Sequence, residues 1–423
     1  MINIRNGSGG TYNVMRPQIE EPGIEYDFHQ YLIWSGDIVY NSLTGAIVKI
    51  EDYEKDRPEL IRRWFMSPKN FDLQSMMYQL RQEKLIRSNS NSGIKKYTIF
   101  TTMKCNAACP YCFQHGGNED TMNIKTANDV ADYIIGNWNK QDQIAITWFG
   151  GEPLVNKEVI NVISEKLRKS NVYYRSSISS NGDLFPSVTD GELYLWNLKT
   201  VQFTIDIPGE SYDALKGLPN GAYERLKDTA KRLGEHDILM QIRVHYHPNL
   251  GLDTAKQIVD DFKGIKNVRM YPAMIYDLGR TKEDYDSLLA LDSYMIESKV
   301  LDFHPYMPQR PVYCMGDNPS TRCIRVDGSF TACEHYFEGE RRGSIYEKIE
   351  DLDLIKKWTG KRKYDIKCYD CPLFPNCELL SNCPSIGKCE EGYGYYRVEQ
   401  IRNWLSRIGG SDEQRETYRN RLV

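Results

Sequence analysis

The cysteines of the 423-residue chain are the side chains best suited to chemistry, and they fall into two groups. Cys105, Cys109 and Cys112 lie within a span of eight residues. The other eight lie towards the C-terminus, at Cys314, Cys323, Cys333, Cys368, Cys371, Cys377, Cys383 and Cys389. Cysteines used only for packing would scatter with the core, whereas thiolates that bind metal clusters are grouped. Three thiolates leave one iron of a four-iron cluster without a protein ligand, and eight would complete two further clusters.

The composition and the sequence pattern exclude several classes of protein and, for the cysteines, disulfide bonding. The N-terminal sequence lacks the apolar core of a secretory signal, and no stretch of about 18 apolar residues occurs that could cross a membrane. We therefore expect a soluble, cytoplasmic protein, and in that reducing compartment disulfides are not expected. The 54 basic and 58 acidic residues give a net charge of −4, which indicates no nucleic-acid partner. The 40% hydrophobic and 26% charged residues are typical of a globular protein.

The segment that follows residue 96 alternates apolar runs with helical patterns. The runs are residues 97–102, 143–149, 172–179, 200–206, 238–245 and 267–275. We place the N-cap of the first helix at Thr126, and we end a later helix, which buries Leu226 and Leu233, at Gly234. Strands that alternate with helices form parallel sheets, and their carboxyl ends meet on one face. Cys105 follows the first run closely, so the first cysteine group is expected on that face.

The spacing of Cys105, Cys109 and Cys112, with the aromatic Tyr111 before the last cysteine, resembles the signature of radical S-adenosylmethionine (SAM) enzymes. The resemblance implies an α/β fold whose core is a partial (β/α)6 TIM barrel, open on one side. It also implies a 4Fe-4S cluster whose free iron binds SAM. A zinc ion held by the three thiolates and a distant histidine is the alternative for these residues.

The resemblance further implies SAM-binding positions at the ends of successive strands. These positions are Tyr111, Gly150, Gly151, Glu152, Ser179, Asn181, Asp206 and Arg243. Glu152 matches the carboxylate that faces the methionine ammonium of SAM, a charge-assisted pair. Ser179 and Asn181 match the segment that contacts the ribose, and Arg243 matches an arginine that pairs with the carboxylate of SAM.

The C-terminal cysteines resemble those of the SPASM domain, which carries two auxiliary iron–sulfur clusters in radical SAM enzymes that act on peptides and proteins. By this resemblance the first auxiliary 4Fe-4S cluster is held by Cys314, Cys323, Cys333 and Cys383. The second is held by Cys368, Cys371, Cys377 and Cys389. The chain would then bind three 4Fe-4S clusters, one of them with SAM. One or two zinc sites in a small ribbon are the alternative that a Cys-x-x-Cys pair alone would fit.

The first ninety residues differ in character. Residues 30–34 and 38–41 predict two strands around a tight turn, a third run follows at 46–50, and helical patterns begin near Leu60 and Leu73. This arrangement resembles the winged-helix element with which maturases of ribosomal peptides bind a leader peptide as an added strand. A structural cap on the barrel is the alternative. We therefore divide the chain into a leader-recognition-like domain (1–90), a radical SAM barrel (91–300) and a SPASM domain (301–423).

The resemblance implies a maturase for a ribosomally synthesised precursor peptide with a leader sequence. A 5′-deoxyadenosyl radical would remove a hydrogen atom from the peptide, and a thioether or carbon–carbon cross-link would form. A flavodoxin- or ferredoxin-type protein would supply the electron. A sulfatase-maturing enzyme, a peptide epimerase and, in another class, a non-enzymatic iron–sulfur electron carrier are the alternatives.

Overall fold

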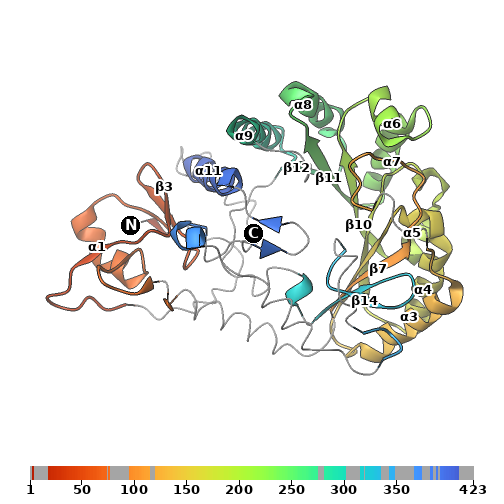
Figure 1. Cartoon of the computed structure of the whole chain (residues 1–423), viewed down its shortest axis with the longest axis horizontal. Helices are drawn as coiled ribbons and strands as arrows, with labels where there is room; N and C mark the ends of the chain where they lie inside the picture. The colour runs from red at the N-terminus through yellow and green to blue at the C-terminus, as the bar shows by residue number, and fades with distance from the viewer. Residues whose placement is uncertain are drawn as a thin grey trace. The chain divides into compact units, whose positions relative to one another are not determined.

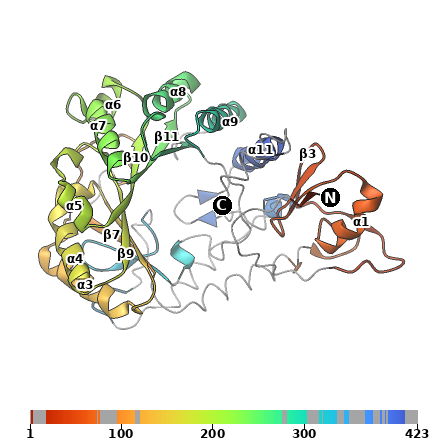
Figure 2. The same cartoon turned by 180° about the vertical axis from the view of Figure 1, so that it is seen from behind.

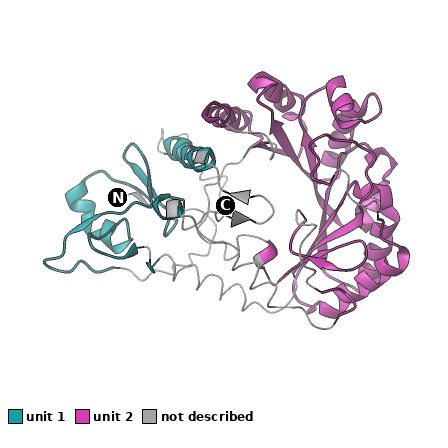
Figure 3. Ribbon diagram, viewed as in Figure 1, with its two compact units in different colours: residues 1–90, 303–314, 361–423 teal, residues 91–302, 315–360 magenta. Residues whose placement is uncertain are grey.

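A computed structural model of the chain describes most of it in two compact units. The described residues are 2–3, 18–73, 75–76, 95–114, 120–274, 281–301, 315–318, 320–334, 343–347, 366–373, 382–383, 387–388 and 391–408. One unit comprises residues 91–302 and 315–360, and the other comprises residues 1–90, 303–314 and 361–423 (Figure 3). Each unit is described by itself below, and the division into three functional domains stays a prediction.

The larger unit is built on an eight-stranded sheet with the strand order β12-β11-β10-β9-β8-β7-β13-β14 (Figure 1). The first six strands in this order are mutually parallel. They are β7 (Lys96–Thr102), β8 (Ile144–Gly150), β9 (Tyr174–Ser179), β10 (Leu198–Ile205), β11 (Leu239–Tyr246) and β12 (Val268–Met274). The six apolar runs of the sequence therefore form parallel strands, which confirms the predicted fold class.

Helices cover the outer face of this sheet (Figures 1 and 2). They are α3 (Ile124–Asn137), α4 (Lys157–Lys169), α5 (Asp190–Leu195), α6 (Glu210–Lys216), α7 (Ala222–Glu235), α8 (Gly251–Phe262) and α9 (Lys282–Glu297), with short turns η1 (Pro153–Asn156) and η2 (Phe185–Ser187). The helix that buries Leu226 and Leu233 ends one residue beyond the predicted Gly234. The predicted cap of α3 was wrong: Asn123 is the N-cap, because its side chain accepts the backbone N–H of Thr126.

A short hairpin extends the sheet beyond the six predicted strands. It consists of β13 (Thr321–Ile324) and β14 (Phe330–Thr331), and η3 (Met315–Asp317) precedes it. The strand β13 pairs in parallel with β7, with Cys323 opposite Thr98. A segment that the sequence assigned to the C-terminal cysteine region therefore continues the barrel sheet.

The smaller unit contains a four-stranded antiparallel sheet in the order β1-β5-β4-β3. Its strands are β1 (Ile2–Asn3), β3 (Leu32–Ser35), β4 (Ile38–Asn41) and β5 (Ile47–Lys49). The strands β3 and β4 form the predicted hairpin around the turn at Gly36. Further elements are β2 (Tyr26–Phe28), paired with β6 (Met66–Pro68), α1 (Tyr53–Arg62), η4 (Ile366–Asp370), β15 (Asn382–Cys383), paired with β16 (Gly387–Lys388), and α11 (Glu391–Ile408).

This small sheet is covered on both faces. Leu60 and Ile61 of α1 pack with Val39 on one face, and Leu405 of α11 packs with Ile33 on the other. Alternate residues of β3 and β4 thus serve two different cores, as the period of a strand requires. The helical pattern predicted from Leu73 lies mostly outside the described residues. None of the helices described is both long enough and apolar enough to span a membrane.

Candidate cofactor and cluster site

The first cysteine group lies in the loop that follows β7, at the carboxyl end of the parallel sheet. Protein atoms around the sulfur of Cys105 raise its pKa to about 11, although the residue as a whole is exposed. Nearby negative charge from Glu152, Cys109 and Cys112 adds to this increase, so the three sulfurs lie in one electrostatic neighbourhood. Without a metal centre the Cys105 thiol therefore stays protonated at neutral pH, and a bound metal would have to displace its proton.

The three cysteines of this loop are the predicted ligands of an iron–sulfur cluster. In the part of the chain that the structure describes, no three Cys, His, Asp or Glu side chains converge closely enough to hold one metal ion. The assignment of Cys105, Cys109 and Cys112 to an iron–sulfur cluster, with one iron left to bind a small molecule, stays a prediction.

Glycines allow the end of β8 to lie directly against the cysteine loop. Gly150 has a φ of +137°, and a Cβ at this position would overlap the carbonyl oxygen of Thr102. A Cβ at Gly151 would overlap the carbonyl of Lys104. The backbone N–H of Gly151 donates to Thr102 at 2.9 Å, and that of Glu152 donates to Lys104 at 2.8 Å. The two glycines are therefore required for this approach.

The carboxylate of Glu152 joins the ends of two strands. It is fully buried and accepts hydrogen bonds from the backbone of Leu154 (3.1 Å), the hydroxyl of Ser180 (3.0 Å) and the backbone of Asn181 (2.7 Å). Burial raises the pKa of Glu152 to about 7, and these hydrogen bonds act in the opposite direction. Its oxygens thus have partners inside the protein, and its contact with the ammonium of SAM stays a prediction. Ser180, which the sequence analysis did not single out, is one of those partners.

Asn181 and Ser179, the predicted ribose contacts, lie at the end of β9 and are half-buried. The side-chain amide of Asn181 donates to Asn106 in the cysteine loop at 2.8 Å. Asn106 in turn donates to Asp183 at 3.0 Å. The end of β9 therefore holds the first turn of the cysteine loop, and Asn181 reaches the position next to Cys105.

Tyr111 is the centre of a buried polar network beneath the cysteine loop. Its hydroxyl donates to the carboxylate of Asp206, which follows β10, and accepts from the ammonium of Lys216 at 3.0 Å. Lys216 is also 3.0 Å from that carboxylate, and Nδ1 of His245 on β11 is 2.6 Å from its other oxygen. The ring of His245 meets the ring of Tyr111 edge-on. Asp206 therefore has three partners, of which the sequence analysis named only Tyr111.

The charges of this network are fixed by burial and pairing. The side chains of Lys216 and Asp206 are 4% and 1% exposed. Burial opposes the charge of Asp206, but Lys216, His245 and Tyr111 outweigh it and hold the pKa of the carboxyl well below its usual value. Burial also lowers the pKa of His245, more than Asp206 raises it. At neutral pH the network thus contains one cation, one anion and a neutral imidazole.

Helix α6 supplies a second hold on the cysteine loop. The backbone N–H of Ala108 donates to the carbonyl of Lys216, the last residue of α6, at 2.7 Å. Tyr212, one turn earlier on the same face, donates through its hydroxyl to the carbonyl of Asn181 at 3.1 Å. A single face of α6 therefore braces both the cysteine loop and the end of β9.

Arg243 lies two residues before His245 on β11, and it therefore points to the same side of the sheet. It is half-buried, and its Nε donates to the hydroxyl of Tyr271 on β12 at 3.1 Å. The guanidinium carbon lies 5.8 Å from the centre of the Tyr271 ring. This contact positions Arg243 near the carboxyl ends of the strands, and its pairing with the carboxylate of SAM stays a prediction.

The structure describes four of the C-terminal cysteines together with their side chains. Cys323 and Cys333 are buried at the β13–β14 hairpin, and Cys368 and Cys371 are half-buried in and after η4. Burial raises the pKa of Cys323, and the negative charge of Cys333 contributes to the increase, so these two thiols are neighbours. The remaining predicted ligands Cys314, Cys377 and Cys389 lie outside the described residues, and Cys383 is described only in its backbone.

Comparison with known proteins shows that the barrel segment is similar to radical SAM proteins. Residues 99–262 match the family model of the Radical SAM superfamily. An uncharacterized protein of Methanocaldococcus jannaschii is 30% identical over 144 residues, which are 33% of this chain and 47% of that protein. The chain thus spans about half the length of that relative. The radical SAM cyclopropyl synthase TigE of Paramaledivibacter caminithermalis is 22% identical over 355 residues, 74% of this chain and 72% of TigE.

Two solved structures share the fold. Native anSMEcpe with bound AdoMet is 16% identical, with a TM-score of 0.58, over 74% of this chain and 99% of that chain. Streptococcus suis SuiB bound to the precursor peptide SuiA is 13% identical, with a TM-score of 0.54, over 86% of this chain and 99% of that chain. The family match, the shared fold and the geometry of the cysteine loop together support a radical SAM domain in residues 99–262.

Proposed function

We propose that the chain is a radical SAM maturase that modifies a ribosomally made precursor peptide and installs a thioether or carbon–carbon cross-link. The observation that carries the proposal is the braced cysteine loop at the carboxyl end of the parallel sheet, inside the segment that matches the Radical SAM superfamily. SuiB, which shares the fold, binds the precursor peptide SuiA, and this likeness supports a peptide as the substrate.

The chain's own residues would position the reaction. A 4Fe-4S cluster with SAM supplies, when bound, a 5′-deoxyadenosyl radical that can remove hydrogen from an unactivated carbon. Cys105, Cys109 and Cys112 would hold the cluster, and the eight C-terminal cysteines would hold two further clusters. Asn181, just after β9, and Arg243, on β11 of the same parallel sheet, would orient SAM, because a fixed reactive group acts on one bond only.

The edge of the small sheet supports a peptide partner. Among the described strands, β3 has a neighbour on one side only. The backbone N–H of Ser42 donates to the carbonyl of Tyr31 at 3.0 Å, so Tyr31 and Ile33 direct their backbone groups towards β4. Because these directions alternate along a strand, Leu32 and Trp34 direct theirs outward. An extended peptide can add a strand at this edge.

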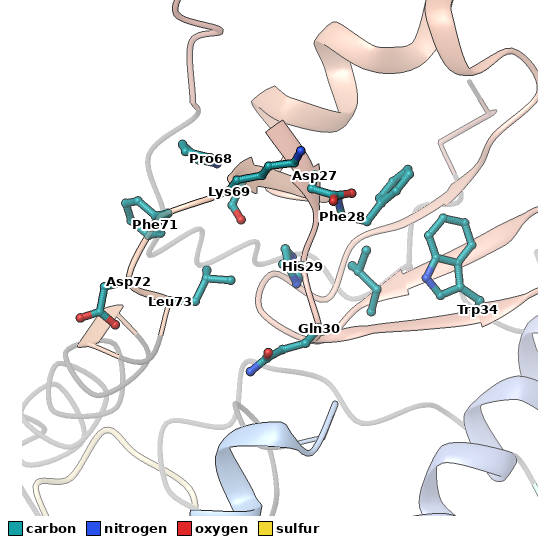
Figure 4. A pocket seen from close by; sticks show the side chains of 12 residues that line it. Asp27, Phe28, His29, Gln30, Trp34, Pro68, Lys69, Phe71, Asp72 and Leu73 are labelled. Atoms are coloured by element: carbon teal, nitrogen blue, oxygen red, sulfur yellow. The ribbon is translucent and has the colours of Figure 1, made fainter. Parts of the chain in front are cut away.

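A pocket of about 720 Å³ lies along the same edge (Figure 4). It is lined by Asp27, Phe28, His29, Gln30, Leu32, Trp34, Ser67, Pro68, Lys69, Phe71, Asp72 and Leu73. The rings of Phe28 and Trp34 meet edge-on with 4.9 Å between their centres, and Trp34 and Phe71 are 36% and 40% exposed. The mixture of exposed aromatic rings and charges of both signs suits the alternating side chains of a docked leader peptide.

The test is anaerobic co-expression of the chain with a short peptide encoded beside its gene, followed by mass spectrometry. The expected result is a peptide that has lost pairs of hydrogen atoms, with fragmentation that locates the new bond. The matched control is Cys109→Ala, which should leave the peptide unmodified and release no 5′-deoxyadenosine. An unmodified peptide in the presence of the unaltered, cluster-loaded chain would contradict the cross-linking proposal, and deuterium uptake from heavy water would indicate epimerisation instead.

A further inference from the structure

The loop between Cys368 and Cys371 is held by two side chains of the N-terminal sheet. The carbonyl oxygen of Tyr369 accepts a hydrogen bond from the side-chain amide of Gln30 at 2.7 Å. The same oxygen accepts a second hydrogen bond from the hydroxyl of Tyr31 at 2.9 Å. Residues more than three hundred positions apart in the sequence therefore meet at one atom of the Cys-x-x-Cys loop.

Packing reinforces these two hydrogen bonds. Tyr31 is fully buried, and Cys368, Tyr369 and Cys371 pack against the cluster that it forms with Leu43. Leu373, just after the loop, is buried in a different cluster together with Ile33, Tyr40 and residues of α11. The loop thus lies on a surface that the N-terminal sheet provides, and the buried ring of Tyr31 fixes the direction of its hydroxyl.

The geometry of the loop depends on the atom that is held. The backbone N–H of Cys371 donates to the carbonyl of Cys368 at 3.1 Å, which closes a turn with Tyr369 and Asp370 at its centre. Two cysteines on such a turn can direct both sulfurs at one metal centre. The rotation of the peptide unit after Tyr369 moves the two cysteines relative to each other, and the donors Gln30 and Tyr31 oppose that rotation.

We propose that Gln30 and Tyr31 are positioning residues for the metal centre of Cys368 and Cys371, so that the N-terminal sheet is a structural part of this auxiliary site. The inference rests on the proposed function only for the kind of metal centre, an auxiliary iron–sulfur cluster. Half-buried thiols in a turn fit such a cluster, since thiolates are its ligands. The N-terminal domain then supports the cluster even when no peptide is bound.

The test measures how fast iron leaves the full-length chain after anaerobic reconstitution with iron and sulfide. A chelator removes the iron, and absorbance follows the loss. All variants carry Cys105→Ala, Cys109→Ala and Cys112→Ala, so that the first cluster contributes nothing. A further variant with Cys368→Ala and Cys371→Ala identifies the fraction of iron that depends on the Cys-x-x-Cys loop.

Tyr31→Phe and Gln30→Ala should each release this fraction about five-fold faster, the factor that the loss of one ordinary hydrogen bond produces. The matched control is Tyr26→Phe, another buried tyrosine of the same unit, whose hydroxyl contacts the backbone of Ile19 and Glu21 instead. It should release iron at the unaltered rate.

Unaltered release from Tyr31→Phe and Gln30→Ala would overturn the inference, and so would equally fast release from Tyr26→Phe, which would indicate general loosening. An iron content that is unchanged in the Cys368→Ala and Cys371→Ala variant would overturn both this inference and the second auxiliary cluster. The expected release rates together with an unmodified precursor peptide would leave the inference standing and overturn only the proposed cross-linking activity.

Discussion

Replacement of Lys216 by methionine tests whether the buried network holds the cysteine loop. Methionine keeps most of the length of the side chain but removes the ammonium, which lies 3.0 Å from Asp206 and 3.0 Å from the hydroxyl of Tyr111. The carboxylate of Asp206 is then buried without a charge partner. Removal of one partner from a buried ion pair typically costs about 3–5 kcal/mol in the free energy of unfolding.

The pH dependence distinguishes lost charge pairing from lost packing. In the unaltered chain the pKa of Asp206 is lowered by folding, so its contribution to stability is present above the pKa of the unfolded state. In Lys216→Met the cation no longer offsets burial, so the pKa of Asp206 in the folded state should rise. The stability lost in the variant should therefore become smaller as the pH falls, because protonation of Asp206 or His245 then removes the unpaired charge.

The assay is urea unfolding of the cluster-free chain at several pH values. The double variant Asp206→Asn with Lys216→Met carries no unpaired charge and should recover most of the loss, since a buried pair can often be replaced by neutral groups. Lys231→Met is the control, because Lys231 pairs with Asp228 on the exposed surface of α7, and it should leave unfolding unchanged. A single variant as stable as the unaltered chain, or a double variant no better than the single one, would refute the electrostatic reasoning.

Three further predictions concern the loop and the peptide edge. Folding raises the pKa of Glu152 to about 7, so the stability of the cluster-free chain should fall between about pH 4.5 and pH 7, and Glu152→Gln should flatten this fall in urea titrations. Gly151→Ala places a Cβ against the carbonyl of Lys104, so it should destabilise the chain by about 1–3 kcal/mol and lower iron uptake at Cys109. A variant with unchanged stability and unchanged iron uptake would contradict the close approach of Gly151 to this carbonyl. Trp34→Pro removes a backbone N–H that points away from β4 and leaves the hydrogen bonds of the hairpin intact. It should therefore weaken binding of the precursor peptide, measured by fluorescence anisotropy, more than Trp34→Ala does. Equal effects of the two substitutions would show that the peptide does not add a strand to β3.

The parallel strands could be predicted because each is a short apolar run between amphipathic helices. That signal is local, and the position of the cysteine loop follows from it, since Cys105 comes soon after β7 ends. The β13–β14 hairpin could not be predicted in the same way. Its pairing with β7 joins Cys323 to Thr98, and no local pattern of the sequence specifies a partner so distant.

The buried network shows the same limit at the level of single residues. Tyr111 and Asp206 were predicted as cofactor positions from their place in motifs, but Lys216 and His245 are ordinary residues of a helix and a strand. One signal was available for Lys216: it follows Tyr212 by four residues and precedes Gly217, so it lies on the inward face where α6 ends. A lysine on such a face requires a buried anion, and only the fold identifies that anion as Asp206.

The residues predicted to contact SAM are of two kinds, which differ in burial and in their hydrogen-bond partners. Glu152 and Asp206 are buried, and their carboxylates accept hydrogen bonds from Ser180, Asn181, Tyr111 and His245, so they join strand ends and the cysteine loop. Asn181 and Arg243 are half-buried at the same strand ends. Substitution of the first pair should therefore reduce stability and iron content together. Arg243→Lys should instead leave both unchanged and raise the SAM concentration needed for cleavage, because a lysine cannot replace the planar fork of the guanidinium. Loss of iron from Arg243→Lys would show that Arg243, like Glu152 and Asp206, supports the structure of the cysteine loop.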